Sequence, residues 1–324
     1  MGSSSIDLSL SNLWRSWFAF RRGKKSTQEL ERFNYYLEEN LYSLHQDLKD
    51  GTYKHQPYKK FIAVDNKRRE ILVANIRDRV VHRLMYQYLV DIYDQTFIFD
   101  VWSCRKEKGL TGAIERTQDF LNKYPRFFVW RADVKKFFDN INHQRLLDII
   151  SLRVSDEKAI NLLKEIIKTH VQAGSEGKGI PIGNLTSQIF ANIYLNELDR
   201  FIKHSIKPRA YIRYGDDFII ISEKVEKLKE IREATVSFLE ENLLLKINSE
   251  SDIIVKAKWG LKFLGVKIYP KGRRLNDRNL QRIHDRISLK NISSYAGLLK
   301  KHSNARKIKY FNWLLLENFF NDVN

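Results

Sequence analysis

The spacing of apolar residues near the amino-terminal end predicts one long amphipathic helix over residues 27–50. Apolar side chains recur there every three or four positions, at Leu30, Phe33, Leu37, Leu41, Leu44 and Leu48. Ser26 and Glu29 stand three residues apart at its start, which is the spacing of a capping box, and Gly51 follows its end. We therefore expect a single helix with its leucine face buried.

Further along the chain, strand-like runs alternate with helical periods. Apolar runs rich in β-branched residues predict strands at 58–64, 69–74, 126–134, 210–214, 218–222, 244–248 and in a pair within 253–269. Apolar residues three or four positions apart predict helices at 77–93, 143–152, 156–172, 185–204, 224–241 and within 278–324. Strands and helices are thus both expected, and the α+β fold class follows from the resemblance described below.

The stretch YIRYGDDFIIIS at 211–222 holds two adjacent acids, Asp216 and Asp217, in the middle of an apolar run. Its two halves predict a β-hairpin around a tight turn, where Gly215 lacks the side chain that would crowd it. Asp133 ends another apolar run, RFFVWRADV. Because a sheet brings strand ends together, we expect the three carboxylates to converge.

Carboxylates that converge repel one another unless a cation neutralises them. Mg²⁺ prefers hard oxygen ligands and binds through a few carboxylates together with substrate phosphates. Two such ions support phosphoryl transfer. An Asp-Asp pair on its own is more often a solvated turn, but the apolar residues around this pair and the second strand that ends in an acid favour a metal site.

The charge of the chain favours a polyanionic partner. Its 324 residues include 57 lysines and arginines against 39 acids, a formal net charge of +18. Such an excess serves solubility, but it is also typical of nucleic-acid binding. No stretch has the character of a membrane span or a secretory signal. Cys104 is the only cysteine, which excludes an internal disulfide and favours a cytoplasmic protein.

Several spaced motifs together resemble those of reverse transcriptases. RADVKKFFDNI, GIPIGNLTSQIFANIYLNELD and RYGDDFIII follow one another in the order of polymerase motifs A, B and C. FLGVKIYP resembles the segment that grips the primer, and IRDRVVHRLMYQYL and SCRKEKG resemble the fingers of intron-type enzymes. The resemblance implies RNA-directed DNA polymerase activity and a right-hand polymerase fold, with an antiparallel palm sheet backed by helices.

The same resemblance implies a division of the chain. We expect a basic and aromatic extension at 1–25, fingers with the start of the palm at 26–125, a palm at 126–270 and a short helical thumb at 271–324. A helical insertion of the fingers is expected at about 143–180.

Within the family, IGNLTSQ and SYAGLLKKHSNARKI are most similar to the reverse transcriptases of diversity-generating retroelements. That similarity implies low-fidelity synthesis of cDNA from a structured RNA template and a primer. It also implies a small, basic accessory protein that forms an oligomer.

The resemblance assigns the catalytic roles residue by residue. Asp133 and Asp216 match the principal metal ligands, and Asp217 matches the third acid. Val134 is expected to add its backbone carbonyl. The implied cofactor is a pair of Mg²⁺ ions, for which Mn²⁺ can substitute.

Phe138, five residues after Asp133, matches the sugar gate. A bulky ring under the ribose clashes with a 2′-hydroxyl and favours deoxynucleotides. Viral RNA-dependent RNA polymerases share the GDD doublet but place a polar acid at the gate, so the ring favours DNA synthesis. The alternative is that Phe138 packs in the core beside Phe137.

Two arginines match the cations that hold the triphosphate. Arg69 and Arg77 align with these positions, and Arg68 and Arg79 are the neighbouring candidates in a cation-rich segment. The alternative for each is a solvated surface arginine. Gly183 would let the backbone approach the nucleotide.

Ile182 departs from the glutamine that most relatives carry at this position. Isoleucine offers no hydrogen bond, and apolar contacts discriminate weakly between similar substrates. The departure predicts reduced base-pair fidelity, chiefly opposite template adenine. The alternative is that Ile182 only packs under the nucleotide.

Contacts to template or primer are implied at six further positions, namely Arg105, Ser187, Gln188, Phe263, Leu264 and Gly265. For Arg105 a structural role is the alternative. Lys246 lies near the place where polymerases hold a general acid for the departing pyrophosphate, although a solvated lysine is the alternative. The aromatic and basic residues of 14–25 could stack on RNA, cover the fingers core or meet a protein partner.

Two other functions stay open. One is an antiphage-defence or group II intron-like reverse transcriptase, which would share the chemistry but not the biological role. The other is a non-catalytic RNA-binding scaffold, against which the three intact acids argue.

Overall fold

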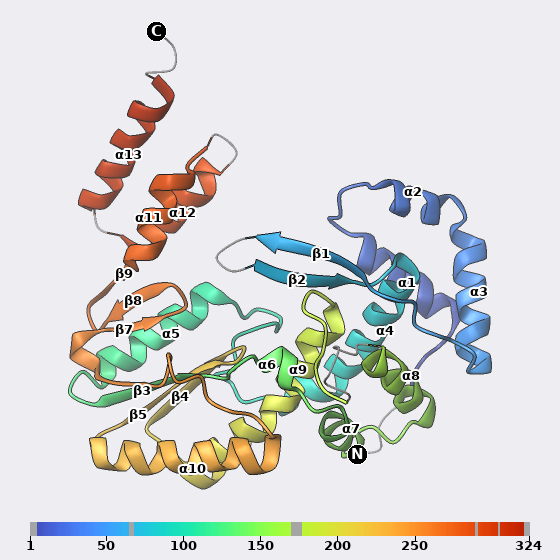
Figure 1. The fold of residues 1–324 in the computed structure, drawn as a ribbon, viewed down its shortest axis with the longest axis horizontal. Helices are drawn as coiled ribbons and strands as arrows, with labels where there is room; N and C mark the ends of the chain where they lie inside the picture. The colour runs from blue at the N-terminus through green and yellow to red at the C-terminus, as the bar shows by residue number, and fades with distance from the viewer. Residues whose placement is uncertain (1–4, 65–67, 170–176, 289–290, 304, 321–324) are drawn as a thin grey trace.

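The computed structural model describes residues 5–64, 68–169, 177–288, 291–303 and 305–320. Its strands form three antiparallel sheets of two, four and three strands, and the helices gather around them (Figure 1). The predicted α+β fold is confirmed.

The four-stranded sheet lies at the centre of the fold. In spatial order it consists of β4 (Ala210–Tyr214), β5 (Asp217–Ser222), β3 (Phe128–Asp133) and β6 (Ile253–Lys256). β4 and β5 form the hairpin that the sequence predicts, and β3 pairs with β5 so that Trp130 faces Ile220 and Asp133 faces Asp217. The end of β3 and the start of β5 therefore lie side by side at one end of this sheet.

Both faces of the central sheet are covered (Figure 1). The covering elements are α9 (Leu185–Arg200) and α10 (Val225–Leu243) on one face and α5 (Leu110–Lys123) and the three-stranded sheet on the other. Side chains alternate between the faces, so Trp130 and Phe218 join one core cluster and Val129 and Ile219 join the other. A sheet covered on both faces needs apolar residues at every position, which explains the continuous apolar runs.

A separate β-hairpin projects beside this layer (Figure 1). It consists of β1 (Lys59–Val64) and β2 (Arg68–Val73), and α4 (Ile76–Tyr93) follows. These three elements match the predicted strands and helix. The turn at 65–67 lies outside the described residues.

The amino-terminal extension contains a helix that the sequence reading does not anticipate. This helix, α1 (Leu10–Arg21), begins at Ser9, whose side chain accepts a hydrogen bond from the Asn12 N–H, and packs on α4. Leu13 and Trp17 are buried at its contact face, whereas Phe18 is 60% exposed. Of the three roles proposed for this aromatic segment, covering the core is the one that the burial of Trp17 supports.

The helix predicted over 27–50 is two helices, α2 (Gln28–Tyr35) and α3 (Leu37–Asp50). Tyr36 between them has φ −105° and ψ 38°, which is not helical. The Asn40 side-chain amide donates to the Phe33 carbonyl at 3.0 Å and so satisfies one of the carbonyls that a continuous helix would have paired.

The start of α2 also differs from the prediction. Thr27 is the N-cap, and its side chain accepts from the Leu30 N–H. The expected capping box of Ser26 and Glu29 is therefore wrong, because the helix begins one residue later and the Ser26 hydroxyl bonds to Glu31 instead. Gly51 ends α3 with φ 73°, as the prediction requires.

The strand predicted at 244–248 does not form. After α10, Leu244 takes φ 56° and Ile247 makes one isolated antiparallel bridge to Val134. The segment runs antiparallel to the chain at the end of β3 for this one residue pair only, so it does not form a ladder.

The remaining elements complete the fold. They are α6 (Phe137–Asn140), α7 (His143–Ser151), α8 (Glu157–Lys168), β7 (Leu261–Phe263), β8 (Val266–Tyr269), β9 (Gly272–Leu275), α11 (Asp277–Arg286), α12 (Ile292–His302) and α13 (Ala305–Phe320), with 3₁₀ turns at Asp94–Thr96 and Ala257–Trp259 and a π-helical turn at Phe201–Ile206. The sequence pattern did not predict α5, α6 or β9, and the second of the two strands expected within 253–269 is the hairpin of β7 and β8. Across the described ranges, no helix is both long and apolar enough to cross a membrane.

Candidate active site

The pairing of β3 with β5 brings the predicted acids together. Asp133 at the end of β3 lies opposite Asp217 at the start of β5, and Asp216 occupies the turn just before it. The Asp133 carboxyl group lies close enough to Asp216 to affect its ionisation. Gly215 has φ 66°, a left-handed conformation that suits the tight turn. The expected convergence of Asp133 with the hairpin tip is therefore present.

Burial and mutual repulsion change the acidity of these groups. Burial, followed by the charge of Asp133, raises the pKa of Asp216 to about 7. Two close carboxyl groups that cannot both ionise hold a proton between them. A divalent cation relieves the same repulsion, so this oxygen-donor pair fits Mg²⁺.

Asp217 forms an ion pair with Arg131. Arg131 donates to its two carboxylate oxygens at 3.0 and 2.8 Å. Burial raises the pKa of Asp217 to about 6, although the hydrogen bonds from Arg131 act in the opposite direction. Within the described ranges, no group of three or more His, Cys, Asp or Glu side chains is arranged to hold a metal ion. All three acids lie at the adjoining ends of β3 and β5, but Arg131 engages the Asp217 carboxylate, so its role as a third metal ligand stays a prediction.

The segment after α10 holds the end of β3 in place. Asn248 donates its backbone N–H to the Asp133 carbonyl at 2.8 Å, and its side-chain amide reaches the Asp133 carboxylate at 3.5 Å. The Lys135 N–H donates to the Lys246 carbonyl at 2.8 Å, while the Lys246 side chain is exposed. Val134 has an apolar side chain, which is buried here. Only its backbone carbonyl could therefore be a metal ligand. Sequence reasoning missed Asn248, whose only signal was its place beside Lys246.

Phe138, which matches the sugar gate, lies beside the loop at 177–184 that precedes α9 and is called the motif B loop below. The Phe138 carbonyl accepts from the Ile180 N–H at 2.8 Å, and the Ile141 carbonyl accepts from the Gly179 N–H at 2.8 Å. Phe137 is buried and Phe138 is half-buried, so Phe137 is the core residue of the two. The backbone of 177–180 thus fixes the loop next to the phenylalanine ring.

The motif B loop also rests on β2. Gly183 has φ 110°, and a Cβ built there would lie 3.1 Å from the Ile71 side chain. Next to it, the Asn184 amide donates to the Leu72 carbonyl at 3.1 Å. Ile182, which directly precedes Gly183, is half-buried. The glycine is therefore required by its backbone conformation and by the close approach of β2.

Ser187 and Gln188 divide between the core and the surface. The Ser187 hydroxyl is buried and donates to the Pro181 carbonyl at 2.6 Å, so it closes the loop rather than facing a template. Gln188 is exposed. The template contacts of Ser187 and Gln188 stay predictions, and the exposure of Gln188 suits such a contact better than the burial of Ser187 does.

A cavity of about 490 Å³ lies between α1, β2 and the motif B loop. Among the residues that the structure describes, its lining includes no carboxylate and four cationic side chains, namely Arg22, Lys24, Arg79 and Arg83. Gly183, Asn184 and Gln188 line the same space. Such a lining suits the phosphates of a nucleotide or a strand.

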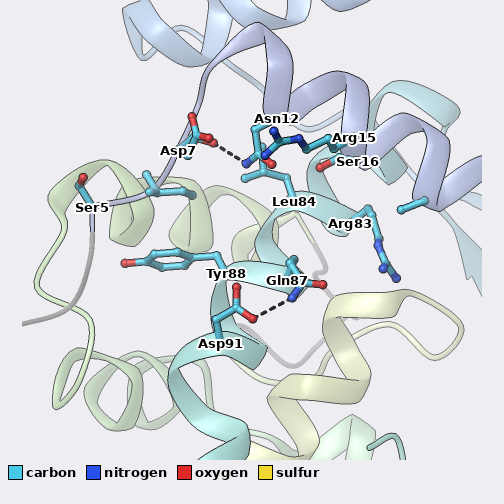
Figure 2. A pocket seen from close by; sticks show the side chains of 12 residues that line it. Ser5, Asp7, Asn12, Arg15, Ser16, Arg83, Leu84, Gln87, Tyr88 and Asp91 are labelled. Atoms are coloured by element: carbon cyan, nitrogen blue, oxygen red, sulfur yellow. Dashed lines mark hydrogen bonds between the residues drawn. The ribbon is translucent and has the colours of Figure 1, made fainter. Parts of the chain in front are cut away.

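A second cavity, of about 440 Å³, lies between α1 and α4 and has mixed charge (Figure 2). Its acids have partners within the protein: the Gln87 amide donates to Asp91, and the Ser9 N–H donates to Asp7. Its lining combines Asp7 and Asp91 with Arg15 and Arg83 and so lacks the uniform charge of the first cavity.

The triphosphate-binding arginines differ from the expectation. Arg77 forms an ion pair with Asp47, and its guanidinium lies 5.2 Å from the centre of the Tyr53 ring, so it does not line the cationic cavity. Arg79 does line it, while donating to the Ala74 carbonyl at 2.7 Å. Arg68 and Arg69 lie in β2, but their side chains fall outside the described part of the structure.

Comparison with known proteins identifies the fold and the family. Residues 54–268, about two thirds of the chain, match the family model described as reverse transcriptase (RNA-dependent DNA polymerase). The chain belongs to the reverse transcriptase family. Protein YkfC of Escherichia coli K12 is 27% identical over 278 residues, which cover 73% of each protein.

The group II intron-encoded protein LtrA of Lactococcus lactis is 25% identical to the chain over 302 residues. That match covers 72% of this reverse transcriptase and 50% of LtrA. Apo telomerase from Candida tropicalis has the same fold, with a TM-score of 0.52 and 14% identity over 81% of the chain and 57% of the telomerase chain. The chain thus spans about half the length of LtrA and of telomerase.

Other residues predicted to contact nucleic acid in this reverse transcriptase have structural partners. Arg105 donates to Asp94 and to the carbonyl oxygens of Asp94, Ile98 and Val101, which favours its structural alternative.

The residues that match the primer grip form the turn between β7 and β8. Phe263 is buried in the core. Leu264 and Gly265 have φ values of 51° and 80° and make the two-residue turn of a β-hairpin. The Gly265 carbonyl accepts from the Asn279 amide at 3.0 Å, which fastens the turn to α11. Any contact to a primer would come from Leu264 and the backbone of this turn.

Proposed function

We propose that the chain copies RNA into DNA, with Asp133 and Asp216 as the principal ligands of two divalent cations and Asp217 as the third acid. The observation that carries this proposal is the half-buried Asp133–Asp216 pair at the adjoining ends of β3 and β5, in a chain of the reverse transcriptase family. The Val134 carbonyl would complete the protein ligands. Two Mg²⁺ ions, or Mn²⁺ in their place, supply activation of the primer 3′-hydroxyl and charge stabilisation at the α-phosphate when bound.

The neighbouring residues would orient the substrates. Phe138 would lie under the deoxyribose and exclude a 2′-hydroxyl, while Gly183 would let the backbone approach the incoming nucleotide. The cationic cavity would hold phosphates, with Arg79 taking the role first expected of Arg77. Lys246 stays a proposal as general acid, because its side chain is exposed near the Asp133 strand end.

Primer extension tests this function. The wild-type chain should extend a DNA primer on an RNA template with dNTPs and Mg²⁺. Asp216→Asn should lower the rate at least about a thousandfold, because the carboxylate pair loses a charge where positioning and charge stabilisation supply most of the rate.

Asp119→Asn is the matched control, since Asp119 is an exposed acid on α5. It should keep the wild-type rate. If wild type and Asp216→Asn extended the primer equally, the Asp133–Asp216 site would not be catalytic. If neither extended it, with the associated RNA and proteins supplied, the RNA-binding scaffold would replace the polymerase.

We also propose that the enzyme serves a diversity-generating retroelement and makes error-prone cDNA from a structured RNA. The support is the IGNLTSQ segment and the half-buried Ile182 beside Gly183. A group II intron-like or antiphage role is the second candidate, favoured by the match to LtrA. A template repeat and its variable copy beside the gene would decide for the retroelement.

The accessory protein proposed with this role is small, basic and oligomeric. One surface of the chain has complementary chemistry: the exposed residues of α2 and α3 include the acids Glu31, Glu38, Glu39 and Asp50 and the tyrosines Tyr35 and Tyr42. Coexpression with the neighbouring genes, followed by size-exclusion chromatography, tests the partner. A chain that elutes alone would remove it.

The division into fingers, palm and thumb stays a proposal with the bounds given above. It is supported by the β1–β2 hairpin with α4 before residue 126, by the four-stranded sheet between 126 and 270, and by the three helices after 271. Limited proteolysis tests it, because domain boundaries are expected at exposed connections.

A further inference from the structure

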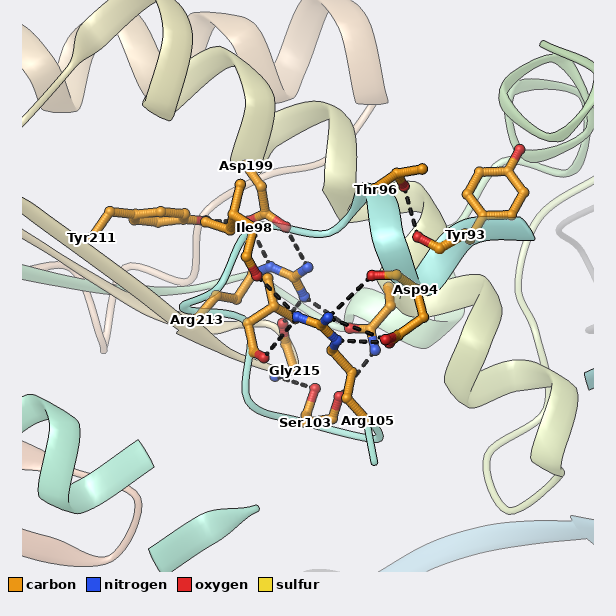
Figure 3. A network of polar contacts seen from close by, with 12 residues as sticks. Tyr93, Asp94, Thr96, Ile98, Ser103, Arg105, Asp199, Tyr211, Arg213 and Gly215 are labelled. Carbon is orange, nitrogen blue, oxygen red and sulfur yellow. Dashed lines mark hydrogen bonds and ion pairs between the residues drawn. The ribbon is translucent and has the colours of Figure 1, made fainter. Parts of the chain in front are cut away.

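The turn that presents Asp216 is held from both sides by buried polar groups (Figure 3). The Arg213 guanidinium donates to the Gly215 carbonyl at 2.9 Å. On the other side, the Gly215 N–H donates to the Ser103 hydroxyl at 2.9 Å. The peptide groups on both sides of Gly215 therefore have fixed partners, one from β4 and one from the loop at 98–105.

These two partners are joined to each other. The Asn192 side chain accepts from Arg213 at 3.2 Å and donates its amide to the Ser103 carbonyl at 3.0 Å. Arg213, Gly215, Ser103 and Asn192 thus form a closed ring of hydrogen bonds. Asn192 is 1% exposed and Ser103 6%, so water competes little for the hydrogen bonds of these two residues.

Arg213 itself is fixed by a buried ion pair. It donates to the two oxygens of Asp199 at 2.8 and 2.5 Å, and Tyr211 donates to the same carboxylate at 2.6 Å. Arg213 and Asp199 have no exposed side-chain area. A fully buried ion pair contributes little net stability because desolvation offsets the attraction. Its retention beside the catalytic turn favours a role in fixing geometry.

The loop that supplies Ser103 is also fixed in advance. Its backbone pairs with β4: the Trp102 N–H donates to the Arg213 carbonyl at 3.0 Å, and the Arg213 N–H donates to the Asp100 carbonyl at 2.9 Å. Arg105 fastens the far end of the loop to Asp94 (Figure 3). Cys104 between them has φ 53°, a costly backbone conformation that persists where surrounding contacts determine it.

We propose that Ser103, Asn192 and Arg213 are positioning residues that set the place of Asp216 relative to Asp133, and that Arg105 acts through them. This inference rests on the proposed polymerase function. None of the four needs to touch substrate. The ring fixes the Gly215 peptide, and that peptide fixes where the Asp216 carboxyl lies. The role implied for Arg105 changes from a template contact to an anchor of the Ser103 loop.

Ser103→Ala tests the ring, because it removes one acceptor and leaves the Arg213–Asp199 pair intact. Hydrogen exchange at the Gly215 amide should become about tenfold faster, since the N–H loses its one protein acceptor. In primer extension, kcat should fall by about tenfold to a hundredfold, as a small misplacement of a catalytic group does. The half-saturating Mg²⁺ concentration should rise, while KM for dNTP should change less than about twofold.

Ser222→Ala is the matched control, because Ser222 is equally buried and lies at the opposite end of β5. It should alter neither the Mg²⁺ requirement nor exchange at Gly215. Ser103→Thr keeps the hydroxyl and should recover most of the Mg²⁺ affinity. Asn192→Asp keeps the acceptor for Arg213 but loses the donor to Ser103, so we expect an intermediate effect.

The possible results separate this inference from the proposed function. Unchanged exchange and an unchanged Mg²⁺ requirement in Ser103→Ala would overturn the positioning role. A lower melting temperature with kcat and Mg²⁺ requirement per folded molecule unchanged would also overturn it, because the ring would then be only structural. If the wild-type chain showed no polymerase activity, the proposed function would fail, and exchange at Gly215 would still test the ring.

Discussion

At the scale of single residues, the neighbouring acids Asp216 and Asp217 have different partners. Asp216 in the turn meets Asp133, whereas Asp217, the first residue of β5, is paired with Arg131 from the adjacent strand. Adjacent identical side chains therefore have different partners because the strand begins between them. The sequence identifies both acids as candidates, but only the strand register shows which partner each of them has.

Ile182 allows a prediction about fidelity at the same scale. Ile182→Gln restores a side chain that can hydrogen-bond to the nucleotide, and errors opposite template adenine should fall by about fivefold, the effect of one hydrogen bond of about 1 kcal/mol. Sequencing of the cDNA measures this rate.

Ile182→Leu is the control, since leucine keeps the apolar character and the volume. Its error rate should equal that of the wild type. Equal error rates for glutamine and isoleucine would mean that Ile182 only packs beside Gly183, and the support that it gives to an error-prone retroelement enzyme would be lost.

At the scale of elements, the sequence predicted those whose pattern depends on their own residues. The β4–β5 hairpin, α4 and β3 matched because period and turn residues determine them locally. The division between α2 and α3 could not be predicted, since it depends on a side-chain bond from Asn40 to the Phe33 carbonyl. Ser103 was missed for a related reason: its partner, Gly215, is 112 residues away.

A buried chain of hydrogen bonds joins α4 to the start of α9. The Thr186 hydroxyl lies 2.6 Å from His82 Nδ1, and His82 Nε2 lies 3.0 Å from His55 Nε2. His55 Nδ1 is 2.6 Å from the Gln56 carbonyl and must donate to it. A neutral His82 completes this chain, because one of its ring nitrogens donates and the other accepts, between the His55 ring and the Thr186 hydroxyl.

Acid should therefore weaken the fold through His82. Burial, followed by the nearby His55 and Arg79, lowers the pKa of His82 to about 3. The unfolded chain binds this proton below about pH 6.5 and the folded chain does not, so stability falls as pH falls from 6.5 toward 3. Between pH 7.5 and 5 the loss from this group should be about 2 kcal/mol.

Urea unfolding of wild type and His82→Asn at these two pH values measures that loss. The substitution lowers stability at neutral pH but should remove about 2 kcal/mol of the pH dependence. His284→Asn, at an exposed histidine of α11, should leave the pH dependence as in the wild type. The same acid-induced loss in His82→Asn would show that another group is responsible.

At the scale of the whole molecule, the charge of +18 is unevenly distributed. The exposed residues of α2 and α3 are mainly acidic, whereas the cavity between α1, β2 and the motif B loop is lined by cations without a carboxylate. Net charge alone predicts a polyanionic partner but does not locate it. Because the charged side chains described in its lining are all cationic, this cavity is where phosphates would concentrate.

The salt dependence of RNA binding tests that location. Each phosphate contact in a single strand contributes about 0.7 to the slope of log affinity against log salt concentration. Arg22→Ala combined with Lys24→Ala should therefore lower the slope by about 1.4. Fluorescence anisotropy of a short labelled single-stranded RNA at several KCl concentrations measures it. Lys227→Ala with Lys229→Ala removes the same charge from the exposed face of α10 and should leave the slope nearly unchanged. Equal reductions in both double variants would mean that RNA responds to total charge and that the cavity is not its path.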